Sequence, residues 1–189
     1  MKALITLLGA VAGVLLLVVA SMIQPALPWP GSGGVALIDC PLSAQLPALL
    51  LTALVCGPRV GLITAVAYLT LGLARLPVFS GGGGMDYLVT PDFGFLVGFV
   101  PASWLVGRLA QQEGMEDPFN LWCACAGGIL VVQTCGGLNL LVGALAGRWQ
   151  DRALQLWLSY GLLPLPWQLL MACLPAVLAL LLRRLLPIR

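Results

Sequence analysis

The sequence has little charge and no histidine. Charged residues make up 8% of its 189 residues and hydrophobic residues 60%, whereas about 25% charged residues are usual in soluble domains. So few charges cannot keep a folded surface in water, which excludes a cytosolic enzyme. The net charge of +2 excludes a nucleic-acid-binding protein, and the missing histidine excludes a His general base, a His metal ligand and a Ser-His-Asp triad. The composition indicates an integral protein of the lipid bilayer.

Uncharged stretches of the chain predict six membrane-spanning helices. A helix needs about 20 apolar residues to cross the hydrocarbon core of a bilayer, and predicted spans of that length lie at residues 3–23, 120–145 and 166–186. Shorter uncharged stretches lie at residues 40–58, 60–74 and 93–107, and these need tilt or snorkelling Arg side chains. The predicted fold class is an all-α integral membrane protein with six transmembrane helices.

The distribution of basic residues predicts the orientation. An even number of spans places both termini on one side, and a cytoplasmic placement puts most basic residues inside, in agreement with the positive-inside rule. These inner residues are Lys2, Arg59, Arg108, Arg183, Arg184 and Arg189. The prediction is a multi-pass protein of the cytoplasmic membrane with both termini cytoplasmic. The first apolar run also suggests a secretory signal, but its 21 residues exceed the usual 7–15, so a retained helix is favoured.

Neither the cysteines nor the glycine run predicts catalysis. The six cysteines contain no C-x-x-C pair, and Cys123 and Cys125 point to different faces of one helix, so no metal site is expected. The glycines at 81–84 lack the pattern of a phosphate-binding loop. They form either a flexible turn or a backbone that can approach a ligand closely. Their aromatic and polar flanks, which include Phe79 and Tyr87, favour a ligand.

Four amide side chains stand inside the predicted spans, where each costs free energy unless it has a partner or a function. They are Gln45, Gln133, Asn139 and Gln168. Gln133 and Asn139 are about 120° apart around one helix, so both can border one cavity. Hydrogen bonding between helices is the alternative for each of them. Together with the outer loops, they predict a polar pocket that water can reach.

Gly9 and Gly13 form a pair of small residues four apart on the first predicted helix. Such pairs let two helices approach each other closely within lipid. We therefore predict that these glycines form an interface with a partner.

Four segments follow a recognisable pattern. Residues 41–45 are similar to P-x-T-x-Q, and residues 57–59 to the Gly-Pro-Arg turn that follows the second helix in that pattern. Residues 68–82 are similar to Y-L-x-L-G-x-x-G-L-P-V-F-A-G-G, and residues 91–99 to P-T-G-G-Y-L-x-G-F. In these motifs the sequence resembles the BioY family, the biotin-specific substrate-capture subunits (S components) of energy-coupling factor (ECF) transporters.

The resemblance implies a single transmembrane substrate-binding domain over residues 1–189 that captures biotin and imports it. It also implies two kinds of partner, a membrane-embedded coupling subunit held by the first helix and ATPase subunits that hydrolyse ATP. The chain itself is expected to do no chemistry and to need no cofactor. The site is expected where the first outer loop, the loop at 77–92 and the outer ends of the last three helices meet. Candidate substrate-binding residues are Gln45, Phe79, Gly82, Tyr87, Asp92, Phe95, Gln133, Asn139, Trp167, Gln168, Met171 and Arg75.

The sequence departs from the family pattern in its last helix. There the family has a P-G-D-L-I-K-like segment whose Asp and Lys contribute to ligand binding, and this chain has Gln168 and Met171. The Gln168 amide can still hydrogen-bond a ureido ring, and Trp167 can stack on the ring. Met171 cannot neutralise a carboxylate. Arg75, which replaces a family Gly, is the candidate counter-ion, and snorkelling at the end of a short helix is its alternative role.

Other functions fit the same composition. The changed residues at 168 and 171 favour an S component for another small vitamin or precursor. A polytopic membrane enzyme is the alternative from another class, but no ionisable residue is centred in a predicted span. A structural membrane subunit without a ligand is the third.

Overall fold

A computed structural model describes residues 2–31, 34–39, 43–74, 76–79, 82–149 and 152–185. Over these residues the helices form six groups, and the first five are α1 (Lys2–Ser21), α2 (Gln45–Cys56), α3 (Pro58–Leu73), α4 with α5 (Phe93–Val97 and Phe99–Leu109) and α6 (Pro118–Leu145). The sixth is a broken helix of four segments, α7 (Ala153–Trp157), the π-helical turn η2 (Leu158–Leu162), α8 (Leu165–Met171) and α9 (Cys173–Leu185). The first, fifth and sixth groups are long and apolar enough to cross a membrane. The predicted fold class is confirmed.

The turn between α2 and α3 is set by two residues with special backbones. Gly57 has a φ of 85°, which a residue with a side chain rarely adopts, and its N–H donates to the Ala53 carbonyl over 3.0 Å. Pro58 follows in the first turn of α3, where its missing N–H costs nothing. The Gly-Pro pair therefore ends one helix and starts the next without a loop.

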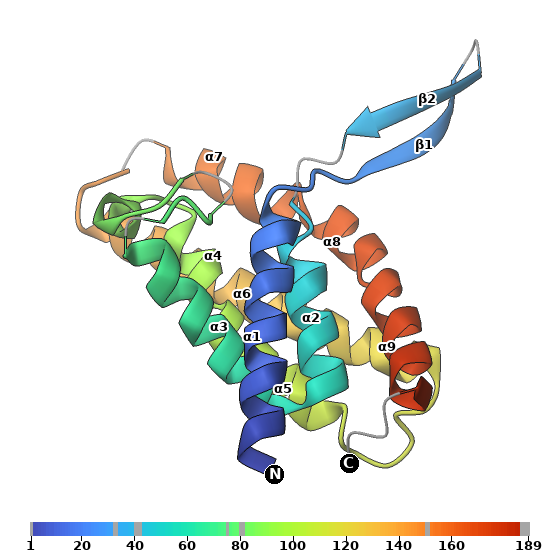
Figure 1. The fold of residues 1–189 in the computed structure, drawn as a ribbon. Coiled ribbons are helices and arrows are strands. Elements are labelled where there is room, and N and C mark those ends of the chain that lie inside the picture. Colours follow the sequence, from blue (N-terminus) through green and yellow to red (C-terminus); the bar gives the residue numbers. More distant parts are fainter. Residues whose placement is uncertain are drawn as a thin grey trace.

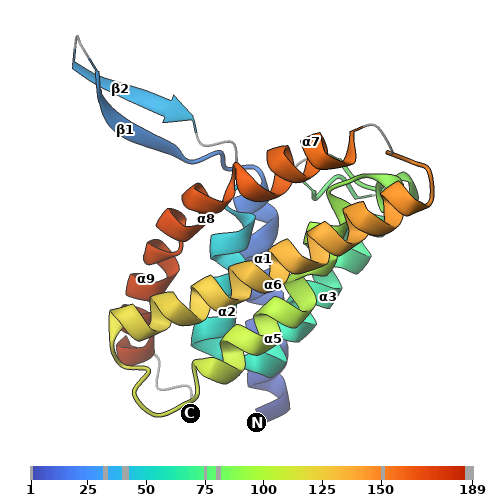
Figure 2. The same cartoon turned by 180° about the vertical axis from the view of Figure 1, so that it is seen from behind.

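Helix α2 lies at the centre of the bundle and contacts α1, α3, α5 and α9 (Figure 1). Its Leu49, Leu50 and Ala53 side chains are fully buried. Helix α6 crosses the opposite side of the bundle (Figure 2) and packs on α4, α5 and α9. The α4–α6 contact is close because the Phe95 ring lies where a side chain on Gly136 would stand.

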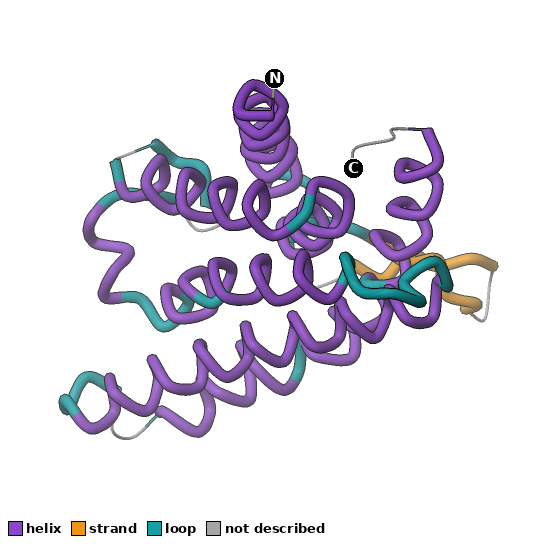
Figure 3. Tube along the Cα trace, turned by 90° about the horizontal axis from the view of Figure 1, so that it is seen from below, coloured by secondary structure: helices purple, strands orange, loops and turns teal. Residues whose placement is uncertain are grey.

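Helix α1 stands at the periphery of the bundle when viewed from the end where it begins (Figure 3). One face carries exposed Leu4, Leu8 and Leu15. Gly9 and Gly13 lie on the other face: a Cβ on Gly13 would stand 2.7 Å from both Thr52 and Thr64. The glycines thus let α1 pack against α2 and α3 of the same chain. Contact with an external partner through them stays a prediction.

The last helix begins earlier than predicted. The expected start near Pro166 is wrong for the helix as a whole, because helical residues begin at Ala153. The prolines at 164 and 166 lie at the start of α8, where a proline lacks only an N–H that a first turn leaves free. They mark a bend: α7 runs across the end of the bundle, and α8 and α9 run down its side (Figures 1 and 2).

A β-hairpin that the sequence analysis did not predict follows α1. Strands β1 (Ala26–Gly31) and β2 (Gly34–Asp39) pair antiparallel from Ala26 opposite Asp39 to Gly31 opposite Gly34. Pro28 and Pro30 are compatible with β1, because a two-stranded ribbon leaves one edge of each strand unpaired. The hairpin projects away from the helices (Figure 1).

Candidate functional site

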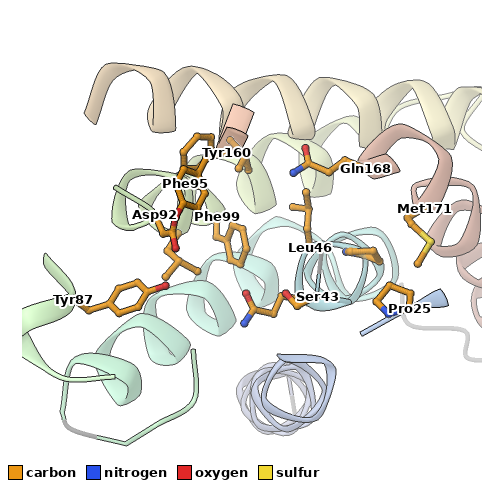
Figure 4. Close-up of a pocket in the computed structure, with 14 residues that line it drawn as sticks. Pro25, Ser43, Leu46, Tyr87, Asp92, Phe95, Phe99, Tyr160, Gln168 and Met171 are labelled. Atoms are coloured by element: carbon orange, nitrogen blue, oxygen red, sulfur yellow. The ribbon is translucent and has the colours of Figure 1, made fainter. Parts of the chain in front are cut away.

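A polar cavity of about 210 Å³ opens near the end of the bundle at which α1 ends and α2 begins. Its walls come from the segment after α1, the start of α2, the 3-10 turn η1 (Met85–Val89) with α4 and α5, and the helices α6 and α8 with η2. The lining residues are Pro25, Ser43, Gln45, Leu46, Pro47, Tyr87, Asp92, Phe95, Leu96, Phe99, Val132, Tyr160, Gln168 and Met171. Tyr87 and Asp92 face Gln168 and Met171 from opposite sides of it (Figure 4).

Asp92 lines this cavity with a carboxylate of which one oxygen has no hydrogen-bond partner among the described residues. Its Oδ1 atom is buried and accepts no hydrogen bond from any described residue. Burial raises the pKa of the Asp92 carboxyl, and hydrogen bonding by the Tyr87 side chain opposes that rise. Burial and the nearby Asp92 charge raise the pKa of Tyr87 to about 12. An unpaired buried acceptor costs about 1–3 kcal/mol, so a ligand N–H that reached Oδ1 would recover that free energy.

Gln45 reaches the cavity from the first turn of α2 and is held from behind. Its Nε2 donates to the Tyr68 hydroxyl over 3.0 Å, and that hydroxyl donates to the Val78 carbonyl over 2.7 Å. Tyr68 is fully buried. The chain of hydrogen bonds joins α2, α3 and the loop after α3 behind the cavity wall.

Gln168 lines the opposite wall of the cavity from Gln45 and is also held by a hydrogen bond from outside the cavity. It accepts a hydrogen bond of 2.8 Å from Nε2 of Gln133 on α6. The adjacent Leu169 carbonyl accepts a second hydrogen bond, from the Trp122 indole N–H over 3.0 Å. Two bonds from α6 therefore fix α8 and the amide that it presents.

Several predicted site residues support the cavity without lining it. The Phe79 ring is buried between Tyr68 and Tyr87, with ring centroids 5.4 and 4.8 Å away, and its backbone bonds reciprocally with that of Gly82 over 3.0 Å. Asn139 donates to the Pro91 carbonyl over 3.3 Å. These contacts hold the segments that carry Tyr87 and Asp92.

The remaining predicted residues divide into four groups. Gln45, Tyr87, Asp92, Phe95, Gln168 and Met171 line the cavity. Gln133 fastens Gln168 from behind, and Trp167 lies on α8 outside the lining set. Arg75 lies outside the described residues.

Eight of the lining residues were not predicted from the sequence, and most of them are apolar. Pro47, Leu96 and Val132 are apolar residues within predicted spans, where nothing distinguishes a cavity wall from the core. Tyr160 was placed outside the last span, so the bend that brings it to the cavity was not anticipated. The one available signal was a tyrosine in an apolar stretch, because its ring can pack in an apolar wall while its hydroxyl stays in contact with water.

A second, larger cavity of about 640 Å³ separates α6 from α7. Its described lining is almost wholly apolar, with Leu138, Leu141 and Trp157 among the larger side chains. Volume favours this cavity, but a specific site needs a few polar groups that converge. The smaller cavity has them and is the candidate site.

The sequence matches the family described as "BioY family" over residues 2–188. A biotin transporter BioY from Rhizobium etli is 33% identical over 107 residues, which cover 52% of this chain and 57% of that protein. A probable biotin transporter BioY from Lysinibacillus sphaericus is 35% identical over 78 residues, or 41% of this chain and 39% of that protein. The matched part thus spans about half or less of these two relatives. A biotin transporter BioY from Rhodobacter capsulatus is 29% identical over 164 residues, covering 84% of this chain and 80% of the relative.

The fold is similar to that of a solved structure described as the S-component for biotin from an ECF-type ABC transporter. The TM-score is 0.73 at 20% sequence identity, over 97% of this chain and 93% of the other. At that identity the likeness concerns the fold alone.

Proposed function

This chain belongs to the BioY family, and from that premise we propose that it captures biotin in the cavity around Asp92, as the S component of an ECF-type transporter. We infer partners from the same premise: a membrane-embedded coupling subunit and ATPase subunits that supply the energy. The chain is a transport subunit and not an enzyme.

The Asp92 carboxylate carries the proposal, because its Oδ1 has no hydrogen-bond partner among the described residues. It faces a cavity that also holds the Gln45 and Gln168 amides, and biotin has a ureido ring whose N–H and carbonyl groups need partners of both kinds. The Phe95 and Phe99 rings in the same wall supply apolar surface for the rest of the ring system. A few polar groups in an apolar cavity give a small-molecule site its specificity.

The placement of the cavity fits capture from outside. Helix α1 begins and α9 ends at one end of the bundle (Figure 1), and the cavity lies near the other end, where Pro25 follows α1. If both termini are cytoplasmic, as the basic residues predict, the cavity opens on the outer face of the cytoplasmic membrane. A substrate-capture subunit needs that orientation.

Calorimetry on the purified protein tests the proposal. We expect saturable binding of biotin without ATP, and no binding of thiamine or riboflavin at the same concentrations. Binding of another vitamin in place of biotin would support an S component of different specificity, which the residues at 168 and 171 favour. Absence of binding to all of them would contradict the proposed function.

A further inference from the structure

We propose that Tyr68 and Gln133, two residues that do not line the cavity, fix which end of each cavity amide faces the ligand. Together with the Asp92 carboxylate, the two oriented amides then present two acceptors and one donor, the complement of a cyclic urea. The inference rests on the proposed function and names the positioning residues of the same site.

The orientation of the Gln45 amide follows from hydrogen counting. A tyrosine hydroxyl has one hydrogen, and Tyr68 donates it to the Val78 carbonyl, which can only accept. The hydroxyl must therefore accept from Gln45, so Nε2 is the atom that faces it. The Oε1 atom of Gln45 is left for the cavity, as an acceptor.

The Gln168 amide has the opposite orientation. In the structure its Oε1 accepts from Gln133 Nε2 over 2.8 Å, and with that direction of the bond its Nε2 is left for the cavity as a donor. Figure 4 shows the Gln168 side chain extended toward the cavity from α8. Trp122 anchors the backbone beside it through the Leu169 carbonyl, so the amide has a fixed base as well as a fixed partner.

Asp92 completes the pattern as the second acceptor. A cyclic urea offers two N–H groups and one carbonyl oxygen, which is the complement of two acceptors and one donor. An amide that is free to turn offers either end and discriminates little between a ligand donor and a ligand acceptor. Specificity at this site therefore depends on the residues that prevent the turn.

Binding of two ligands to three proteins tests this reading. The ligands are biotin and 2-iminobiotin, whose guanidine group donates at the position where the biotin carbonyl accepts. The proteins are the wild type, Tyr68→Phe and Gln133→Met. Each of the two substitutions roughly keeps the volume of the side chain and removes its hydrogen-bonding group. Matched controls are Thr70→Val on α3 and Gln155→Leu on α7, both exposed and away from the cavity.

The two variants should change the affinities for the two ligands in different ways. Loss of one net hydrogen bond corresponds to roughly 3- to 10-fold in affinity. Gln133→Met should lower the affinity for biotin by that factor. It should also lower the ratio of the affinities for biotin and 2-iminobiotin, because the freed Gln168 amide can present either end to the ligand. Tyr68→Phe should weaken both ligands alike, because Gln45 faces an N–H in both. The controls should bind both ligands as the wild type does.

Three outcomes overturn the inference while leaving the proposed function intact. They are wild-type biotin affinity in Tyr68→Phe, an unchanged ratio of the two ligands in Gln133→Met, and a ratio shifted equally by the Gln155→Leu control. If Tyr68→Phe does not fold, the ligand ratio in Gln133→Met decides alone. If the wild type binds no biotin, the proposed function itself is wrong.

Discussion

Replacement of Asp92 by Asn tests the group on which the proposed site depends. The substitution keeps the shape of the side chain and removes its charge. A hydrogen bond to a charged group is worth about 1.5–3 kcal/mol, and each 1.4 kcal/mol is about tenfold in affinity. Oδ1 of Asp92 is buried and has no partner among the described residues, so a ligand N–H that reaches it forms a new bond and displaces none. We expect Asp92→Asn to weaken biotin by about 10- to 150-fold in calorimetry.

The pH dependence of binding provides a second measurement on the same residue. Burial raises the pKa of Asp92 above its usual value of 3.8. A ligand N–H stabilises the charged form, so affinity should rise with pH through the raised pKa and be lost on acidification. The carboxylate of biotin titrates in a similar range, so the measurement uses biotin amide, which has no carboxylate. Asp92→Asn should remove this pH dependence.

Asp86 supplies the matched control for both measurements. It lies on η1, in the segment that precedes Asp92, and is exposed. Asp86→Asn should leave the affinity and its pH dependence unchanged. Wild-type affinity in Asp92→Asn, or an equal loss in both variants, would refute the role of Asp92 as ligand acceptor.

Three further predictions concern the bundle and the ligand's charge. Gly13→Leu should separate α1 from Thr52 and Thr64 and lower the free energy of unfolding by about 1–3 kcal/mol, measured by thermal unfolding in detergent against an exposed Val11→Leu control. Arg183→Met should destabilise the fold by about 2 kcal/mol or more, because the Arg183 guanidinium donates to the carbonyls of three segments, at Leu54, Ala110 and Met115; exposed Arg184→Met is its control in the same assay. Arg75→Gln should weaken biotin but not biotin methyl ester, and equal affinity of the wild type for acid and ester would remove the need for a cationic partner.

The six spans were predictable because charge and helix breakers interrupt an otherwise apolar chain. Arg59 divides two of the predicted spans, at residues 40–58 and 60–74, and the structure turns next to it, between α2 and α3 at Gly57. The start of the last helix was not predictable, because a proline is compatible with both a helix start and a bend within a longer helix. At Pro166 only the packing of α7 across the end of the bundle shows that the proline marks a bend and not the start of the helix.

The site was predictable at the level of segments and less so at the level of side chains. Buried amides in apolar spans cost free energy, and this signal identified both Gln45, which lines the cavity, and Gln133, which supports a residue that does. The two roles differ in the direction of the side chain, which depends on the helix rotation that packing selects. Phe79 shows the same limit, since an aromatic residue beside a glycine loop can bind a ligand or, as here, pack behind Tyr87.

The position of the one carboxylate among the described lining residues offers the last test. In the pattern that residues 91–99 and the last helix resemble, Thr stands at 92 and Asp at 168, and this chain has Asp92 and Gln168 instead. Both residues line one cavity from opposite walls (Figure 4). Relative to the pattern, this chain therefore keeps one carboxylate but has it on the opposite wall of the cavity. Asp92→Thr should lose the acceptor, and Gln168→Asp should place two carboxylates in one cavity, where like charges disfavour each other. Each single variant should bind biotin weakly, and the double variant should bind at least about tenfold more tightly than the product of the two losses predicts, a coupling of about 1.4 kcal/mol. Additive losses would mean that the two walls act independently and that the carboxylate has not simply changed sides.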